Sequence, residues 1–321
     1  MLKDLMSQGL KTINADQTLK EALDKMVKEN IRRLAVSVAG QVIGVISART
    51  IVKEALSNPN WAQKKVSEVT RPGIFADPDT PNKIGAKLMV KYGVGSLLIR
   101  GGGIVTERDI AKAAPRTTIP AISIGTTNVV TLSDSSTMSD AASLMVSTGI
   151  SHAPIVSDTD VVGMVSLRDV IKSLNDGNLS ANVKDYMSKG VVSLDVDATM
   201  ADVANLITTK NVGSVLIMED LSTKASNLRG IVTEWDLVRT YSTLTKAHVL
   251  LKVDPSKIRS IARALVVTPR ISGVSIVYGP YDIVVDMDVE SPEALGKVVV
   301  DSIGSMAGVK ETLTLIEVEE L

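Results

Sequence analysis

Hydrophobic and polar positions follow a pattern that recurs four times along the first three quarters of the chain. In the first copy, Leu19, Ala22, Leu23, Met26 and Val27 fall on one face of a helix. Two apolar runs joined by a short turn follow, RLAVSV, AG and QVIGVIS, which predicts a β-hairpin that leads into a second helix. Each copy therefore reads strand, helix, strand, strand, helix.

Each main helix is expected to begin after a threonine. The four threonines are Thr18, Thr80, Thr137 and Thr199. Three of them are answered three positions later by Glu21, Asp140 and Asp202, the spacing of a capping box. Pro81 after Thr80 is expected to occupy the first helical position.

A short motif closes each copy and fixes the period of the repeat. It reads GVISARTI from Gly44, GIVTERDI from Gly103, GMVSLRDV from Gly163 and GIVTEWDL from Gly230, at spacings of 59, 60 and 67. In the fourth copy the segment MEDLSTKASNLR lengthens the hairpin, and it is expected to form an exposed loop rather than a new element.

Odd copies resemble odd copies, and even copies resemble even ones. IRRLA (31–35) and ISHAP (150–154) stand where the even copies have VGSLL (94–98) and VGSVL (212–216). A three-stranded sheet with helices on one face leaves its other face bare, so the units are expected to pack in pairs. The predicted modules are residues 1–121 and 122–244.

The last 76 residues follow a different pattern, β, α, β-turn-β, α, β, over 246–321. This order predicts a ferredoxin-like sandwich, with helices beginning at Pro255 and Pro292. The predicted fold class is therefore α+β, two tandem modules plus a C-terminal βαββαβ domain. Asp286, Asp288 and Glu290 alternate along one strand, so the three carboxylates lie on one face of the sheet. They could bind a divalent cation, but we favour a solvent-exposed face whose negative charge is offset by a lysine on a neighbouring strand, such as Lys252.

Composition narrows the function classes. The 35 basic and 36 acidic residues nearly cancel, which makes nucleic acid an unlikely partner, and eight aromatic residues offer few stacking platforms. With no cysteine, there is no disulfide and no thiolate metal site. The start MLKDLMSQGLKTINAD lacks the order of a signal peptide and no apolar run has the length of a spanning helix, so we expect a soluble, cytoplasmic protein with no membrane partner.

No catalytic constellation stands out. His152 and His248 lie in different domains, and Gly101–Gly103 reads as a hairpin turn because no GK[ST] follows it. The sequence thus predicts a protein that is not an enzyme and has no metal site.

The motif hydroxyl and the aspartate three residues later have two interpretations. They can cap the helix, Ser or Thr at the N-cap and Asp at the third position. Alternatively, the same helix N-terminus presents free amides to a phosphate while the carboxylate accepts the hydroxyls of a ribose. The sequence of one copy leaves both interpretations open.

Four copies of G-h-h-S/T-x-x-D-h after such a unit resemble cystathionine β-synthase (CBS) domains, here as two tandem pairs. The resemblance implies adenosine nucleotides (AMP, ADP or ATP) or S-adenosylmethionine bound in clefts between paired units. The residues that match the family pattern are Thr106 with Asp109, Ser166 with Asp169, and Thr233 with Asp236. Arg108 and Arg168 inside the motif, and Arg33 and His152 before it, are candidate phosphate partners, although exposed arginines are also ordinary surface residues. Thr50 replaces the aspartate of the first copy, so that cleft is expected to be weak or empty.

The hairpin YGPYDIVV in the tail resembles the effector-binding domain of the leucine-responsive regulator family, which is ACT-like. That resemblance implies a homodimer or higher homo-oligomer formed through sheets, and an amino-acid-like effector. The sequence therefore favours a ligand sensor. Its alternatives are an interaction protein with vestigial clefts and a subunit that regulates an enzyme or transporter in trans.

Overall fold

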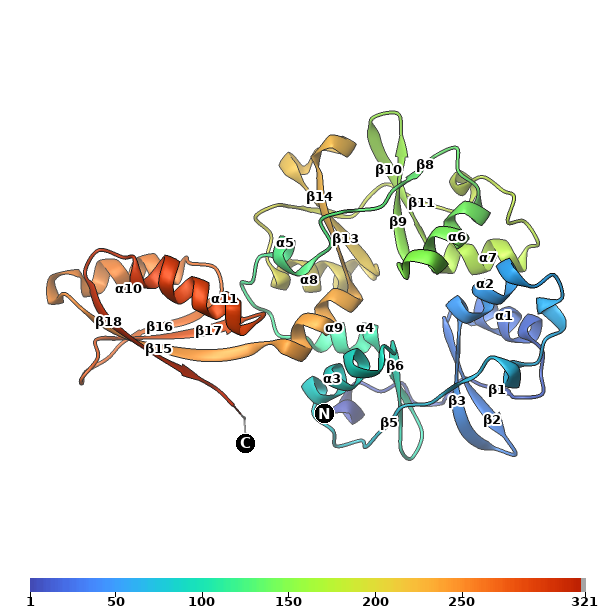
Figure 1. Cartoon of the computed structure of the whole chain (residues 1–321), viewed down its shortest axis with the longest axis horizontal. Helices are drawn as coiled ribbons and strands as arrows, with labels where there is room; N and C mark the ends of the chain where they lie inside the picture. Colours follow the sequence, from blue (N-terminus) through green and yellow to red (C-terminus); the bar gives the residue numbers. More distant parts are fainter. Residues whose placement is uncertain (319–321) are drawn as a thin grey trace.

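The computed structural model describes residues 1–318, so the last three residues of the expected final segment, 319–321, lie outside the described residues. Four repeats form four lobes, and the C-terminal domain projects from one side (Figure 1). The expected order of elements is found in every repeat.

Repeat one contains β1 (Thr12–Asn14), α1 (Leu19–Lys28), β2 (Arg33–Val38), β3 (Gln41–Ser47) and α2 (Ala48–Ser57). Repeat two contains β5 (Phe75–Ala76), α3 (Asn82–Tyr92), β6 (Ser96–Ile99), β7 (Ile104–Thr106) and α4 (Glu107–Ala113). Repeat three contains β8 (Leu132–Ser133), α6 (Met138–Thr148), β9 (His152–Ser157), β10 (Asp160–Ser166) and α7 (Leu167–Asn175). Repeat four contains β12 (Ser193–Asp195), α8 (Met200–Lys210), β13 (Ser214–Met218), β14 (Leu228–Thr233) and α9 (Glu234–Thr243).

Each repeat has its own sheet. In all four, the first strand runs parallel to the second and the hairpin strands pair antiparallel. The odd repeats gain a short fourth strand from the linker that follows them, β4 (Arg71–Pro72) and β11 (Ser188–Lys189). The hairpin turn Ala39–Gly40 has positive φ at both residues, 49° and 81°, as a two-residue turn of primed type requires.

The expected helix starts are confirmed at three of the four threonines. Thr18, Thr137 and Thr199 are N-caps with complete capping boxes. In repeat two, α3 begins one residue later than predicted: Pro81 is itself the N-cap, because its ψ of 143° is extended rather than helical.

The inserted segment of repeat four is largely exposed, as expected, and it adds no α-helix or strand between β13 and β14. It does hold two short 3-10 turns, Glu219–Leu221 and Ala225–Asn227, and it pairs with the hairpin of repeat three through the bridge between Asp160 and Lys224. Val161 donates its N–H to Thr223 O at 2.7 Å, and Lys224 Nζ lies 2.9 Å from Asp160 Oδ2. The insertion therefore joins repeats three and four.

The segments that precede the odd repeats complete the even ones. Leu2 is fully buried in the core of repeat two, and Ser7 pairs with Ile104. Likewise α5 (Ala121–Ile124) packs on β14 of repeat four, where Thr126 pairs with Ile231.

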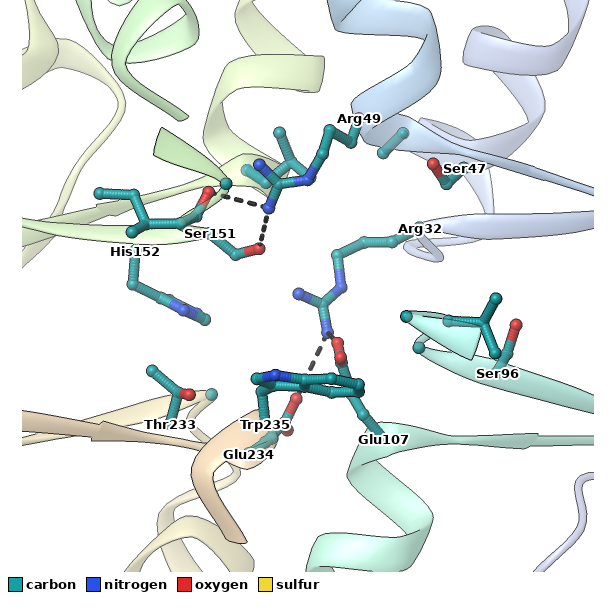
Figure 2. Close-up of a pocket in the computed structure, with 18 of the residues that line it drawn as sticks. Arg32, Ser47, Arg49, Ser96, Glu107, Ser151, His152, Thr233, Glu234 and Trp235 are labelled. Carbon is teal, nitrogen blue, oxygen red and sulfur yellow. Dashed lines mark hydrogen bonds and ion pairs between the residues drawn. The ribbon is translucent and has the colours of Figure 1, made fainter. Parts of the chain in front are cut away.

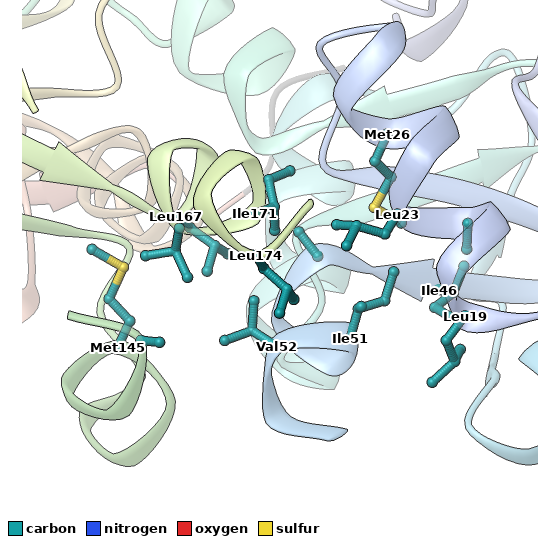
Figure 3. Close-up of a cluster of buried hydrophobic side chains, with 14 of the residues drawn as sticks. Leu19, Leu23, Met26, Ile46, Ile51, Val52, Met145, Leu167, Ile171 and Leu174 are labelled. Carbon is teal, nitrogen blue, oxygen red and sulfur yellow. The ribbon is translucent and has the colours of Figure 1, made fainter. Parts of the chain in front are cut away.

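The helices of the two modules pack against one another, odd on odd and even on even. Helix α7 contacts α1 and α2, while α9 contacts α3 and α4. One apolar core joins repeats one and three, so that Leu23 and Ile51 share a cluster with Met145 and Ile171 (Figure 3). Burying this shared aliphatic surface holds repeats one and three together.

The C-terminal domain has the expected ferredoxin-like order. Its elements are β15 (Thr245–Val253), α10 (Ile258–Val266), β16 (Ile271–Ile276), β17 (Ile283–Val289), α11 (Pro292–Lys297) and β18 (Val309–Ile316). The strands lie in the order β16-β17-β15-β18. Pro292 opens α11 as predicted, whereas Pro255 opens a short 3-10 turn and α10 itself begins three residues later, at Ile258. Only the buried Leu244 separates α9 from β15, so the last helix of repeat four runs directly into this domain.

Candidate functional site

The four closing motifs all form helix caps. Asp109, Asp169 and Asp236 each use Oδ2 to accept two hydrogen bonds, from the backbone N–H and from the hydroxyl of their N-cap residue, at 2.6–2.8 Å. In repeat one, Ser47 caps α2 and its hydroxyl lies 3.0 Å from that of Thr50. The capping interpretation is thus realised, and it leaves the second carboxylate oxygen, Oδ1, for other partners.

The partner of this second oxygen, Oδ1, differs between the copies. Asp236 Oδ1 lies 3.2 Å from Arg239, whereas Oδ1 of Asp109 and of Asp169 makes no contact of this kind within residues 1–318. Burial raises the pKa of Asp169 and of Asp236 above the ordinary aspartate value, partly offset by the bonds from their cap residues.

A cavity of about 440 Å³ lies between the repeats and receives residues from all four. At one end it is lined by Ser47 and Thr50 of repeat one, and at the other by Thr233 and Asp236 of repeat four. The linkers before repeats two and three contribute Gly73 and Asn128 to its walls. Its volume lies within the range of small-molecule sites.

The middle of the cavity holds a network of ion pairs that links three repeats (Figure 2). Arg32 contacts Glu107 at 3.1 Å and Glu234 at 3.3 Å, and Arg33 contacts Glu107 at 3.1 Å. Arg108 donates from Nε to Glu234 at 2.5 Å. Glu234 is only 2% exposed, so these pairs are shielded from solvent.

Burial and charge act against each other at the two glutamates. Burial works to raise the pKa of Glu107, but Arg33 and Arg32 outweigh it and hold that pKa below the ordinary value. At Glu234 burial prevails and raises the pKa, although Arg108 and Arg32 oppose the rise. Because two guanidinium groups bond the Glu234 carboxylate, we treat it as ionised.

His152 lies beside this network and is uncharged. Burial, reinforced by Arg32, lowers its pKa from 6.5 to about 3. Its Nδ1 is buried without a hydrogen-bond partner among the described residues. The ring lies against Gly213, where a β-carbon would come within 2.6 Å of Nε2.

Arg49 supplies a cation at the wall of the cavity. Its guanidinium donates to the carbonyl of Met145, to Ile150 O at 2.9 Å and to Ser151 Oγ at 2.8 Å. All three acceptors are neutral, so the positive charge of Arg49 is not matched by a carboxylate in these contacts.

The cavity brings together four of the ten candidate ligand-binding residues that the sequence predicts. Arg33, His152, Thr233 and Asp236 line it, while the remaining six lie outside its wall, namely Thr106, Arg108, Asp109, Ser166, Arg168 and Asp169. Arg108 is bonded to Glu234 and to Asn211, and Arg168 has a buried Nε without a partner among residues 1–318. The motif of repeat one, where Thr50 replaces the aspartate, does line the cavity.

Sequence reasoning missed Arg32, Arg49, Glu107, Glu234 and Trp235, all of which line the cavity. One signal was available. Glutamate follows the motif hydroxyl in both even copies, as Glu107 and Glu234, where the odd copies have Ala48 and Leu167.

In the C-terminal domain, the carboxylates of β17 and of the residue that follows it interact with different side chains. Asp286 Oδ1 lies 2.7 Å from His248 Nδ1, and Glu290 pairs with Arg270. Lys252 faces Glu311 in the strand register instead. No group of three His, Asp or Glu side chains suited to a metal ion occurs in the part of the chain that the structure describes.

Across residues 1–318, no helix combines the length and the apolar character needed to cross a bilayer.

Two family models match the chain. The CBS domain model matches residues 2–57, 66–116, 121–176 and 183–243, and the Lrp/AsnC ligand binding domain model matches residues 246–321. The recognised families and the predicted α+β fold are thereby confirmed.

Several similar proteins come from archaea. The uncharacterized protein MJ1232 of Methanocaldococcus jannaschii is 28% identical over 37% of this chain, and the match spans 38% of that protein. The uncharacterized protein MJ1225 of the same organism is 22% identical over 75% of this chain and 99% of its own length.

Two solved structures share the fold. The crystal structure of MJ1225, described as a candidate archaeal homologue of g-AMPK, has a TM-score of 0.65 at 19% identity and covers 74% of this chain and 98% of that one. An uncharacterized conserved protein from Pyrococcus horikoshii has a TM-score of 0.53 at 17% identity, over 75% of this chain and 99% of that one. The chain belongs to the CBS-domain family, with four CBS units followed by an Lrp/AsnC ligand-binding domain.

Proposed function

We propose that the protein is a non-catalytic regulatory sensor that binds an adenosine nucleotide in the cavity between its CBS units. The observation that carries the proposal is the part of the cavity wall that repeat four provides. There the N-terminus of α9, with Thr233 and the buried Asp236, lines the same cavity as Arg32, which pairs with Glu234. A carboxylate is suited to ribose hydroxyls, and a helix N-terminus with nearby arginines is suited to a phosphate.

Regulation would follow from the way the cavity is built. Residues from four repeats line it, so a ligand there contacts both modules at once. If it binds one arrangement of the modules more tightly than another, it shifts the equilibrium between them. The resemblance of the fold to MJ1225, described as a candidate homologue of g-AMPK, supports a regulatory role.

Equilibrium dialysis with labelled AMP, ADP, ATP and S-adenosylmethionine tests the proposal. We expect saturable binding by the wild type and a loss of roughly 10- to 100-fold in Asp236→Asn, because a bond to a charged group contributes about 1.5–3 kcal/mol. Asparagine keeps one oxygen to accept the Thr233 N–H, so the helix cap is retained.

Asp202→Asn is the matched control. Asp202 caps α8 of the same repeat through the same bonds, at 2.9 Å and 2.6 Å, but it is exposed and does not line the cavity. Equal losses in the two variants would assign the effect to helix capping. No binding of any adenosine compound at millimolar concentration would favour the alternative, an interaction protein with vestigial clefts.

We further propose that the C-terminal domain joins copies of the chain and responds to an amino-acid-like effector. The sheet face away from the helices carries Leu250, Val284, Leu313 and Leu315, which share one face by strand register. Leu313 and Leu315 are 41% and 47% exposed, as expected of a face that a partner covers. Light scattering on the full chain should give at least twice the monomer mass of 34.0 kDa, and a monomer at micromolar concentration would contradict this.

A further inference from the structure

Glu107 and Glu234 stand at the same place in the two even repeats, one residue after the hydroxyl that caps the motif helix. Both side chains are bonded to arginines. Glu107 pairs with Arg32 and Arg33, which line the cavity, and Glu234 pairs with Arg32 and with Arg108, which lies outside the cavity wall. The guanidinium groups of Arg32 and Arg33 are therefore already bonded to carboxylates of the protein itself, and Figure 2 shows the pairs that Arg32 makes with Glu107 and Glu234.

The even repeats also provide the space in which the network sits. A β-carbon at Gly95 would come within 1.9 Å of Arg33 Nη2 and 2.9 Å of Glu107 Oε2. A side chain there would force the guanidinium of Arg33 to shift from its position beside Glu107. Arg33 of repeat one can therefore reach Glu107 of repeat two in this position because Gly95 has no side chain.

The formal charges of the wall nearly cancel. Four arginines line the cavity, Arg32, Arg33, Arg49 and Arg71, against the three carboxylates Glu107, Glu234 and Asp236. His152 adds no charge near neutral pH. The excess is one positive charge, and the partly buried Arg49 is a lining cation whose bonded acceptors are all neutral.

We propose that Glu107 and Glu234 determine the charge of the ligand: as anions built into the wall, they restrict the cavity to an adenosine compound with a single anionic group, such as AMP, and disfavour di- and triphosphates. The inference rests on the proposed binding of adenosine compounds. A second or third phosphate would have to compete with these carboxylates for Arg32 and Arg33, and the carboxylates would repel it.

The test compares AMP with ATP by equilibrium dialysis in the wild type, Glu107→Gln and Glu234→Gln. We expect the wild type to bind AMP at least tenfold more tightly than ATP. In each glutamine variant we expect ATP affinity to rise roughly tenfold and to rise more than AMP affinity, because one charge that repels the added phosphates is removed at close range. Glu219→Gln, which removes a glutamate paired with Arg229 away from the cavity, should leave both affinities unchanged.

The wild type alone can overturn the inference, since ATP binding as tight as AMP binding would show that the glutamates exclude nothing. An unchanged ratio of ATP to AMP affinity in folded glutamine variants would overturn it as well. Inorganic tripolyphosphate gives a readout without a nucleoside, and it should raise the melting temperature of the glutamine variants more than that of the wild type. If no adenosine compound binds the wild type or any variant, the proposed function itself fails, which is a distinct outcome.

Discussion

His152 makes the stability of the CBS array depend on pH. Its pKa is about 3 in the folded protein, against an ordinary value of 6.5. The groups that act on it are Arg32, Arg108 and Arg168, which oppose its charge, and Glu107, which favours it. Burial is the largest cause of the shift.

The sign follows from the lowered pKa. Above pH 6.5 the histidine is neutral in both states, and its stabilising contribution is fully present. As the pH falls from 6.5 toward 3, the unfolded chain takes up a proton that the folded protein does not, and stability is lost by up to about 1.4 kcal/mol per pH unit. At pH 5 the loss from this group amounts to about 2 kcal/mol.

The assay is urea unfolding of the wild type and His152→Gln at pH 7, 6 and 5, followed by tryptophan fluorescence. Both tryptophans, Trp61 and Trp235, lie in the CBS array, so the signal reports on this part of the chain. Other titrating groups affect both proteins alike. We expect the wild type to lose about 2 kcal/mol more than the variant between pH 7 and pH 5. Parallel loss in the two proteins would refute the reasoning.

Two further predictions concern packing. Gly95→Ala places a β-carbon 1.9 Å from Arg33 Nη2, so the Arg33 guanidinium, which pairs with Glu107, must shift. We expect the free energy of unfolding in urea to fall by about 1–3 kcal/mol. Gly296→Ala, which meets nothing within 4 Å in α11, is the control and should be neutral or slightly stabilising. Ile171→Ala removes a side chain from the core shared by repeats one and three, and we expect the free energy of unfolding to fall by about 2–5 kcal/mol. A change below about 0.5 kcal/mol, as a surface substitution gives, would mean that the two modules do not depend on this contact.

The local structure of each repeat was determined by the sequence. A cap, an apolar face and a turn act over a few residues, so Thr18 with Glu21, the helix after it and the turn at Ala39–Gly40 were predictable from neighbours in the chain. The βαββαβ order of the tail was predictable for the same reason.

The composition of the cavity was decided by the tertiary structure. Arg32 contacts Glu107 and Glu234 from 75 and 202 residues away, and these contacts depend on how repeat one packs against repeats two and four, which no local pattern encodes. The motif aspartates look alike in the sequence, yet Asp236 lines the cavity while Asp109 and Asp169 do not. Repetition specifies each unit, but burial of the apolar helix faces between units selects which copies of the motif meet.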